Sequence, residues 1–241
     1  MSAGRSATVS PQDEQPQPQD TNLPYQPRQL TLGEATSREI FLFHSPKNHR
    51  TVKVTEYLHL ALALRLEFDP GVESYVERPR KIFVSPKFAV DIGFWTRSKV
   101  GQEAFLVGVP NAGTPGHKRD GAVMRDSDRM KLAAQRHDIT LTYITEQELL
   151  TESIAIRTYF ELLPHVQYAR RVPTQLTIRQ GIKAFFTVTP RASFRTLINS
   201  LPQFGRDQVF AVAASLLHLG NLRMDLTRRL SLDSMLEEAH V

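Results

Sequence analysis

The sequence predicts an α/β domain followed by a smaller, mostly helical domain, and two patterns predict this division. From residue 56 to residue 145, a helical pattern leads into three strand-like runs, and a second helical pattern leads into one more. Beyond residue 173, three helical patterns precede residues 221–232, which alternate as in a short hairpin. A chain of 241 residues is long enough to build two modest domains of this kind.

Composition is that of a soluble globular protein, because 41% of the residues are hydrophobic and 23% are charged. The chain has no cysteine, which excludes disulfides, thiolate metal sites and cysteine nucleophiles. It has no run of about eighteen apolar residues and no apolar segment behind its first methionine, so we expect a cytoplasmic protein with no membrane partner. The net charge of +5 mildly favours a polyanionic partner.

Residues 1–29 are rich in Pro, Gln, Ser and Asp and carry almost no large apolar side chain. Such a segment buries too little surface to fold, so we predict a disordered tail. Residues 38–54 alternate polar and apolar side chains poorly, and we expect them to form an irregular lead-in to the first helix.

Basic side chains gather in this lead-in and in the Gly- and Pro-bearing loop 111–121. They are candidate contacts for the phosphates of a nucleic-acid backbone. The candidates are Lys47, Arg50, Lys53, Lys118 and Arg119. The alternative for each of them is a solvated charged surface, which is the ordinary role of such side chains.

The first helix is predicted to start near Glu56, because apolar residues then recur on one face at three- and four-residue spacing. The Asp-Pro pair at residues 69–70 ends it. Strand-like runs rich in Val, Ile, Phe and Tyr follow at residues 71–84, 87–95 and 102–110. The predicted result is a helix that leads into an antiparallel meander.

Asp91 stands alone among apolar residues in the run 87–95. In a continuous strand, Phe88, Val90 and Ile92 share one face and Asp91 lies on the other. A buried, unpaired carboxylate is costly, so Asp91 should bind a metal ion, meet a cation or hydrogen bonds, or face an open cleft. An exposed strand edge is the alternative.

The order of several short motifs resembles the TnsA subunits of heteromeric transposases. These motifs are RTVKVTE, EFDPGV, FAVDIGF and LTYITEQEL. The resemblance covers most of the chain and implies a restriction-endonuclease-like α/β domain over residues 30–172, followed by a mostly α winged-helix domain over residues 173–241. It also implies that Glu56 and Asp91 are catalytic acids that bind Mg²⁺. The implied partners are the DNA of transposon ends, a transposase and an AAA+ ATPase of the same element.

One element of that resemblance is missing from the chain. TnsA-like nucleases carry an acid or Gln, one residue and then Lys in the third strand, where this chain has Val107 and Val109. The metal ion activates the attacking water and the lysine positions it, so the absence of this triplet predicts a weak or lost nuclease. Glu103, which shares strand parity with Val107, is the candidate replacement acid, and Lys99 or Lys87 is the nearest candidate cation.

In the second domain, three helices followed by a hairpin are the layout of a winged helix. Its third helix, residues 206–220, is too apolar for a typical DNA-reading helix, so we favour protein contact there. Arg223, Arg228 and Arg229 in the hairpin are candidates for phosphate contacts without sequence specificity. The helix that precedes this domain is expected to end at Pro164.

Three functions are compatible with these patterns. The first is a DNA-bound, partner-binding subunit of a transposition complex that has lost most or all of its nuclease activity. The second is an active Mg²⁺-dependent endonuclease that cuts transposon ends with migrated catalytic residues. The third is a winged-helix regulator that binds DNA.

Overall fold

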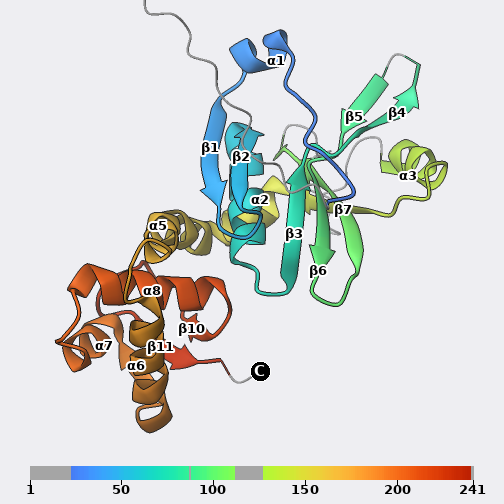
Figure 1. Ribbon diagram of the computed structural model, residues 1–241. Coiled ribbons are helices and arrows are strands. Elements are labelled where there is room, and N and C mark those ends of the chain that lie inside the picture. The colour runs from blue at the N-terminus through green and yellow to red at the C-terminus, as the bar shows by residue number, and fades with distance from the viewer. Residues whose placement is uncertain (1–22, 87, 112–126, 240–241) are drawn as a thin grey trace, which may run out of the picture.

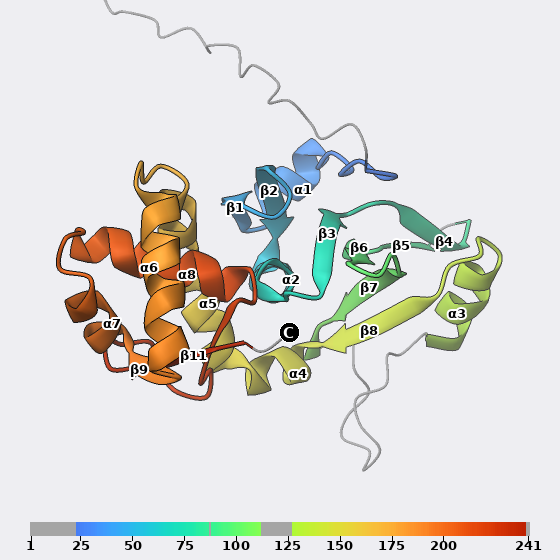
Figure 2. The same ribbon diagram turned by 60° about the horizontal axis from the view of Figure 1, so that its bottom comes forward.

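The computed structural model of this chain describes residues 23–86, 88–111 and 127–239 (Figure 1). Over these residues the protein is a mixed α/β structure with several sheets and eight helices. None of the helices in these ranges is long and apolar enough to cross a membrane. Figure 2 shows the C-terminal helices at one end of the molecule and the largest sheet at the other.

The largest sheet has four strands in the order β3-β6-β7-β8. The first three strands are antiparallel, and β7 and β8 are parallel. Helix α2 precedes β3 in the sequence, and helix α3 connects β7 to β8. The bounds of these elements are α2 (Glu56–Phe68), β3 (Val72–Glu77), β6 (Phe94–Ser98), β7 (Glu103–Val109), α3 (Ser127–Gln135) and β8 (Leu141–Thr145). The prediction of a helix from residue 56 to the Asp-Pro pair is confirmed.

The two faces of this sheet are covered by different hydrophobic clusters. Phe94 and Leu106 pack in the cluster that contains the apolar residues of α2. Their sequence neighbours Trp95 and Phe105 pack in a second cluster, together with Ala133 of α3. Because side chains alternate along a strand, every residue of β6 and β7 can be assigned to the α2 face or the α3 face.

Residues 38–54 are more regular than the sequence predicts. They form a hairpin of β1 (Ile40–Ser45) and β2 (Arg50–Thr55), in which Val52 and Val54 are buried against α2. His49, in the turn, has a positive φ of 54°. The alternation is confined to the second strand, which is why the whole segment did not show a strand pattern.

Two of the predicted strands are interrupted, because a hairpin is inserted between β3 and β6. This hairpin consists of β4 (Lys81–Ser85) and β5 (Phe88–Asp91). The chain leaves β3 at Arg78, which has a φ of 46°, and at Pro79, which has no N–H to donate to a ladder. Residues 71–84 and 87–95 are therefore two strands each, and Asp91 ends a strand instead of lying within one.

The C-terminal part begins with a helix that continues past a proline. Helix α5 (Ser153–Ala169) includes Pro164, so the prediction that it ends there is wrong. Leu162, Leu163 and Val166 on either side of the proline are buried, and this packing outweighs the loss of one backbone hydrogen bond.

The remaining C-terminal elements are three helices and three short strands that form a sheet in the order β10-β11-β9. The predicted hairpin is also longer than expected, because its second strand starts at Met235. The bounds are α6 (Gln175–Val188), β9 (Arg191–Ser193), α7 (Phe194–Ser200), α8 (Arg206–His218), β10 (Leu222–Met224) and β11 (Met235–Glu238). The two remaining short helices are α1 (Leu32–Ser37) and α4 (Glu146–Thr151).

Helix α8 lies against α5, which in turn packs on α2 (Figure 1). At this junction Glu67 of α2 is fully buried, and His218 Nε2 of α8 lies 2.8 Å from its Oε1. Tyr75 and Ser45 donate hydrogen bonds of 2.6 Å and 2.5 Å to the other oxygen of Glu67. The C-terminal part therefore packs on the α/β part through a polar contact that water does not reach.

The boundary of the predicted tail requires a correction. Residues 1–22 lie outside the described residues, but residues 23–29 pack on the sheet. The ring of Tyr25 lies 5.5 Å from those of Trp95 and Phe105, measured between centroids. The backbone N–H of Arg28 donates to the carbonyl of Arg78. Two aromatic contacts and a backbone hydrogen bond are enough to order a segment whose composition is otherwise polar.

Candidate functional site

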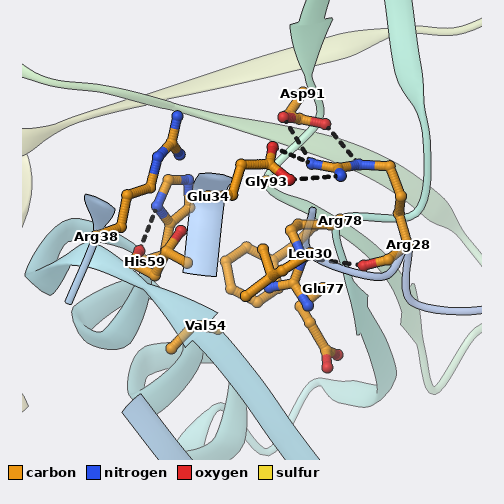
Figure 3. A pocket seen from close by; sticks show the side chains of 12 residues that line it. Arg28, Leu30, Glu34, Arg38, Val54, His59, Glu77, Arg78, Asp91 and Gly93 are labelled. Carbon is orange, nitrogen blue, oxygen red and sulfur yellow. Dashed lines mark hydrogen bonds and ion pairs between the residues drawn. The ribbon is translucent and has the colours of Figure 1, made fainter. Parts of the chain in front are cut away.

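The candidate site is a pocket on the α2 face of the four-stranded sheet (Figure 3). The N-terminal segment 23–38, which we call the strap, forms one wall. The end of β2 and the first turn of α2 form another, and the junction between β5 and β6 forms the third. Its lining includes seven ionisable side chains, namely Arg28, Glu34, Arg38, His59, Glu77, Arg78 and Asp91.

Asp91 meets a cation, as one of the alternatives for an isolated strand carboxylate predicts. Arg28 of the strap donates to both of its oxygens, at 3.1 Å from Nε and 2.9 Å from Nη2. The same guanidinium donates to both oxygens of Glu34, at 3.0 and 2.9 Å. These hydrogen bonds hold the pKa of Glu34 well below its usual value. One guanidinium therefore bridges two carboxylates, as Figure 3 shows.

Glu56 starts α2 with a φ of 66°, and its carboxylate lies 3.6 Å from the guanidinium of Arg38. Arg38 and Thr55, the neighbours of Glu56, line the same pocket as Asp91. The two predicted acids therefore border one region of the α2 face, but each of them is paired with an arginine.

The valines that stand for the missing triplet face away from this pocket. Val107 and Val109 share the strand parity of Phe105, which packs on the α3 face, and both are buried. A metal-binding side chain of β7 that faced α2 near the pocket would have to stand at position 106 or 108. Gly108 offers no side chain, and Leu106 is part of the core. The ligand positions taken from the sequence are thus on the wrong face.

Glu103 lies at the opposite end of β7 from the pocket, so its prediction as a replacement acid is wrong. It pairs with Arg97 in the strand register, whereas the pocket lining includes Phe94, which pairs with Leu106. Three residues of extended strand separate Glu103 from Leu106, which is roughly 10 Å. The carboxylate of Glu103 instead accepts hydrogen bonds from Trp95 Nε1 at 2.9 Å and from Arg97 at 3.1 Å. Of the candidate cations, Lys99 lies in the turn beyond β6, and Lys87 lies outside the described residues.

His59 is a pocket residue that the sequence did not identify. Its Nδ1 lies 2.9 Å from the carbonyl oxygen of Thr55, one turn earlier in α2. Burial lowers its pKa, so the ring is neutral near pH 7, and the carbonyl fixes the proton on Nδ1. Nε2 faces β6 and β7 at Gly93 and Gly108, where an added Cβ would lie 3.5 and 3.6 Å from it. The sequence carries no signal for this contact, because the two glycines come opposite the histidine only in the folded sheet.

Of the predicted phosphate contacts, two are engaged within the fold. Arg50 is buried and donates to both oxygens of Glu77, at 3.0 and 2.6 Å. The ammonium of Lys47 donates to the carbonyls of Leu66 and Asp69 at the end of α2, and burial lowers its pKa to about 8. Neither side chain is therefore presented to a nucleic acid, which corrects the prediction.

The other three predicted phosphate contacts stay predictions. Lys53 is exposed on β2. Lys118 and Arg119 lie outside the described residues.

The pocket residues do not form a Mg²⁺ site as they are arranged. Within the described ranges, no group of three or more His, Cys, Asp or Glu side chains is close enough to hold a metal ion. Mg²⁺ requires six oxygen ligands in nearly octahedral geometry, and both oxygens of Asp91 already accept hydrogen bonds from Arg28. The pocket therefore holds the guanidinium of Arg28 between the carboxylates of Asp91 and Glu34.

The chain matches no known protein-family model and no curated protein.

Proposed function

We propose that this protein is a TnsA-like subunit of a DNA transposition complex that keeps a nuclease-type core but does not cut DNA. The main support for this proposal is that the guanidinium of Arg28 donates hydrogen bonds to both oxygens of Asp91. Apart from the inserted hairpin β4-β5, the order of elements is α2-β3-β6-β7-α3-β8, and the last two strands are parallel. This order supports the restriction-endonuclease-like part of the proposal. In this arrangement Asp91 ends β5 and precedes β6, the second strand of the four-stranded sheet, whereas the TnsA-like pattern puts its metal-binding acid at the end of the second strand.

Arg28 neutralises charge as a metal ion would, but it cannot perform the chemistry of one. A bound divalent cation lowers the pKa of a coordinated water and accepts phosphate oxygens as ligands. A guanidinium keeps its proton throughout the accessible pH range and offers only hydrogen-bond donors. The proposed outcome is a stable pocket that lacks an activated water, so cleavage remains at background.

The C-terminal elements support a winged-helix role in protein contact. Their order, α6-β9-α7-α8 followed by β10 and β11, is compatible with a winged-helix layout, in which α8 would take the position of the recognition helix. That helix packs against α5, and its residues Val209, Ala213 and Leu216 are buried. From Val209 to His218 no residue of this helix is exposed, so this part of the helix presents no open face to a major groove. DNA contact in this domain would then rest on exposed arginines such as Arg223, Arg228 and Arg229, without base reading.

The partners that this proposal implies are transposon-end DNA and two protein subunits of the same element, a transposase and an AAA+ ATPase. The net charge of +5 is compatible with DNA contact. We propose that the protein holds its partners on the DNA and leaves the strand cleavage to them.

One observation favours the active Mg²⁺-dependent endonuclease as a second candidate. The neutral ring of His59, with Nδ1 bonded to a backbone carbonyl, leaves Nε2 as a proton acceptor on the pocket side of α2. In this candidate the strap moves away when DNA binds, and Asp91 is freed from Arg28.

A nicking assay separates the two candidates. Purified protein is incubated with supercoiled plasmid and with transposon-end DNA, in Mg²⁺ and in Mn²⁺, with and without the neighbouring subunits of the element. The variants are Asp91→Asn, Arg28→Ala and, as a control carboxylate of the four-stranded sheet outside the pocket lining, Glu103→Gln. We expect background nicking from all four proteins, with a gel shift of the DNA retained. Nicking by the wild type that Asp91→Asn abolishes and Glu103→Gln preserves would overturn the proposal.

A further inference from the structure

A groove with an apolar lining runs between helices α2 and α5 on the surface of the protein. Its walls carry large side chains that water reaches, since Tyr57 is 58% exposed, Phe160 is 59% exposed and Ile154 is 41% exposed. The complete lining is Phe41, Tyr57, Leu60, Leu64, Ser153, Ile154, Ile156, Arg157, Phe160 and Arg229. An aromatic-rich apolar surface of this kind usually marks a site of interaction with another molecule.

The spacing of the wall residues fits a third helix. Tyr57, Leu60 and Leu64 follow each other at intervals of three and four residues along α2, so they form one stripe, in which Tyr57 is exposed and Leu60 and Leu64 are buried at the floor of the groove. Ile154, Arg157 and Phe160 form a second stripe on α5 at intervals of three residues. Each stripe is about 10 Å long at 1.5 Å per residue, which is roughly two turns of a helix. Two stripes that line one hollow can accept an amphipathic helix, as in helix-in-groove recognition.

The charge of the groove selects among possible helices. Two arginines are part of the lining, Arg157 from α5 and Arg229 from the connection between β10 and β11, and the lining contains no carboxylate. Arg157 forms an ion pair of 2.8 Å with Glu161, one turn further along α5. Arg229 is exposed, so it can turn toward a ligand. Because Arg157 is paired with Glu161, Arg229 supplies the positive charge at the edge of an otherwise apolar groove.

We propose that this groove binds an amphipathic helix of a partner protein, with a stripe of Leu or Phe side chains toward the groove and Glu or Asp side chains along its edge. The apolar stripe covers Tyr57 and Phe160, and the acidic edge meets Arg229. This assignment rests on the groove alone and holds whether or not the protein belongs to a transposition complex.

A second copy of this chain is a poorer occupant on the same evidence. In a twofold dimer the groove of one copy would face the groove of the other. Arg229 of each copy would then lie near the arginines of the opposite groove, and neither lining contains an acid to pair with them. A lipid surface is also a poorer fit, because the apolar side chains line a hollow between two helices.

The test uses synthetic peptides of eighteen residues that carry a fluorescent label. One peptide is helical, with Leu and Phe at a spacing of three and four residues and with Glu at the flanking positions. A second has Lys in place of each Glu, and a third has the composition of the first in scrambled order. Binding to the full chain is measured by fluorescence anisotropy at two salt concentrations, and self-association is measured by sedimentation.

Two protein variants and one matched control complete the test. Phe160→Ala removes an exposed wall residue, and Arg229→Glu reverses the charge at the edge. Leu176→Ala is the control, since Leu176 is 72% exposed on α6, outside the groove lining. Because Phe160 and Arg229 are exposed, the melting temperatures of both variants should match that of the wild type, which separates lost binding from lost folding.

We expect the Glu-flanked peptide to bind at least tenfold more tightly than the Lys-flanked and scrambled peptides. Phe160→Ala should weaken binding at least tenfold, Arg229→Glu should weaken it several-fold at low salt, and Leu176→Ala should leave it unchanged. The inference is overturned by equal binding of the Glu- and Lys-flanked peptides, by binding that survives Phe160→Ala, or by failure of all peptides to bind. It is also overturned by a dimer that Phe160→Ala dissociates, or by binding to anionic vesicles without peptide binding.

Discussion

Asp91 in the pocket and Glu67 at the junction of α2 with α8 are both carboxylates with several donors, but their surroundings differ. The side chain of Asp91 is 29% exposed, and its main donor comes from the strap at the N-terminal end of the fold. Glu67 is fully buried, and its donors come from α8, β3 and β1. Water can replace the donors of the first carboxylate, whereas it cannot reach the second.

The difference shows where the stability of the protein is concentrated. An ion pair that water reaches contributes up to about 1 kcal/mol, because solvent screens the charges and both side chains lose freedom. Removal of one partner from a buried charged cluster costs about 3–5 kcal/mol, because the others lose their hydrogen bonds without gaining water. The pocket cluster therefore contributes little to the stability of the fold, whereas the junction cluster contributes much of it.

Replacement of Glu67 tests this comparison with the largest expected effect. Glu67→Ala leaves His218, Tyr75 and Ser45 without their shared acceptor, so the free energy of unfolding should fall by about 3–5 kcal/mol. Urea denaturation measures the loss. Glu73→Ala, at an exposed carboxylate of β3, is the control and should change stability by less than about 0.5 kcal/mol. Similar losses from both variants would contradict the comparison.

Gly220 provides a second test of the junction that involves no charge. It has a φ of 76°, and a Cβ at this position would lie 2.5 Å from Cβ of Pro70, which follows α2. Gly220→Ala should therefore cost about 1–3 kcal/mol from the backbone alone, with a further loss from the clash. Gly101→Ala is the matched control, because Gly101 has a φ of 80° and open space around it. Equal losses in urea denaturation would show that the contact with Pro70 is irrelevant.

The junction should also make stability depend on acidity. Burial raises the pKa of Glu67, but His218, Ser45 and Tyr75 outweigh it and hold that pKa below its usual value. A folded pKa below the unfolded one gives stability that is present above the unfolded value of about 4.5 and is lost as the pH falls through the folded value. We expect up to about 1.4 kcal/mol of loss per pH unit in that window from this group. Thermal melts from pH 7 to pH 3 should show a shallower slope for Glu67→Gln.

The smallest effect on stability is expected in the pocket. Arg28→Ala removes the donor from Asp91 and Glu34, both of which remain partly exposed, so the free energy of unfolding should fall by less than about 1 kcal/mol. The pKa of Glu34 should rise toward its usual value, because the hydrogen bonds of Arg28 are the main cause of its depression. An NMR titration of the side-chain carboxyl measures this change. A loss as large as that of Glu67→Ala would remove the distinction between the two clusters.

Much of the fold followed from periodicity, and the exceptions have physical causes. Helix α2 and strand β8 were predictable from an apolar run that Asp-Pro ends and from strand-like alternation, although α2 is buried on nearly all sides and not along one face. The inserted hairpin β4-β5 was not, because its residues continue the strand pattern of the runs on either side. The extension of α5 past Pro164 depends on tertiary packing, which local rules do not contain.

The site could be predicted only in part for related reasons. The sequence showed that Asp91 required a partner, and the structure supplies Arg28 from a segment that composition alone marked as a tail. The face of Val107 could not be assigned, because strand parity separates two faces without saying which one a helix covers. His59 became visible only when β6 and β7 put two glycines opposite its ring.

The strap has a practical consequence for the choice of protein material. Residues 23–29 have the composition that is usually trimmed before purification or crystallisation, and with them go Tyr25 and Arg28. A shortened protein that begins at Leu30 would leave Asp91 and Glu34 without Arg28, with Lys81 at 3.9 Å as the cation that still pairs with Asp91. Added Mn²⁺ could then bind where the intact chain holds a guanidinium, and a metal titration on trimmed material would describe a pocket that the longer chain keeps closed.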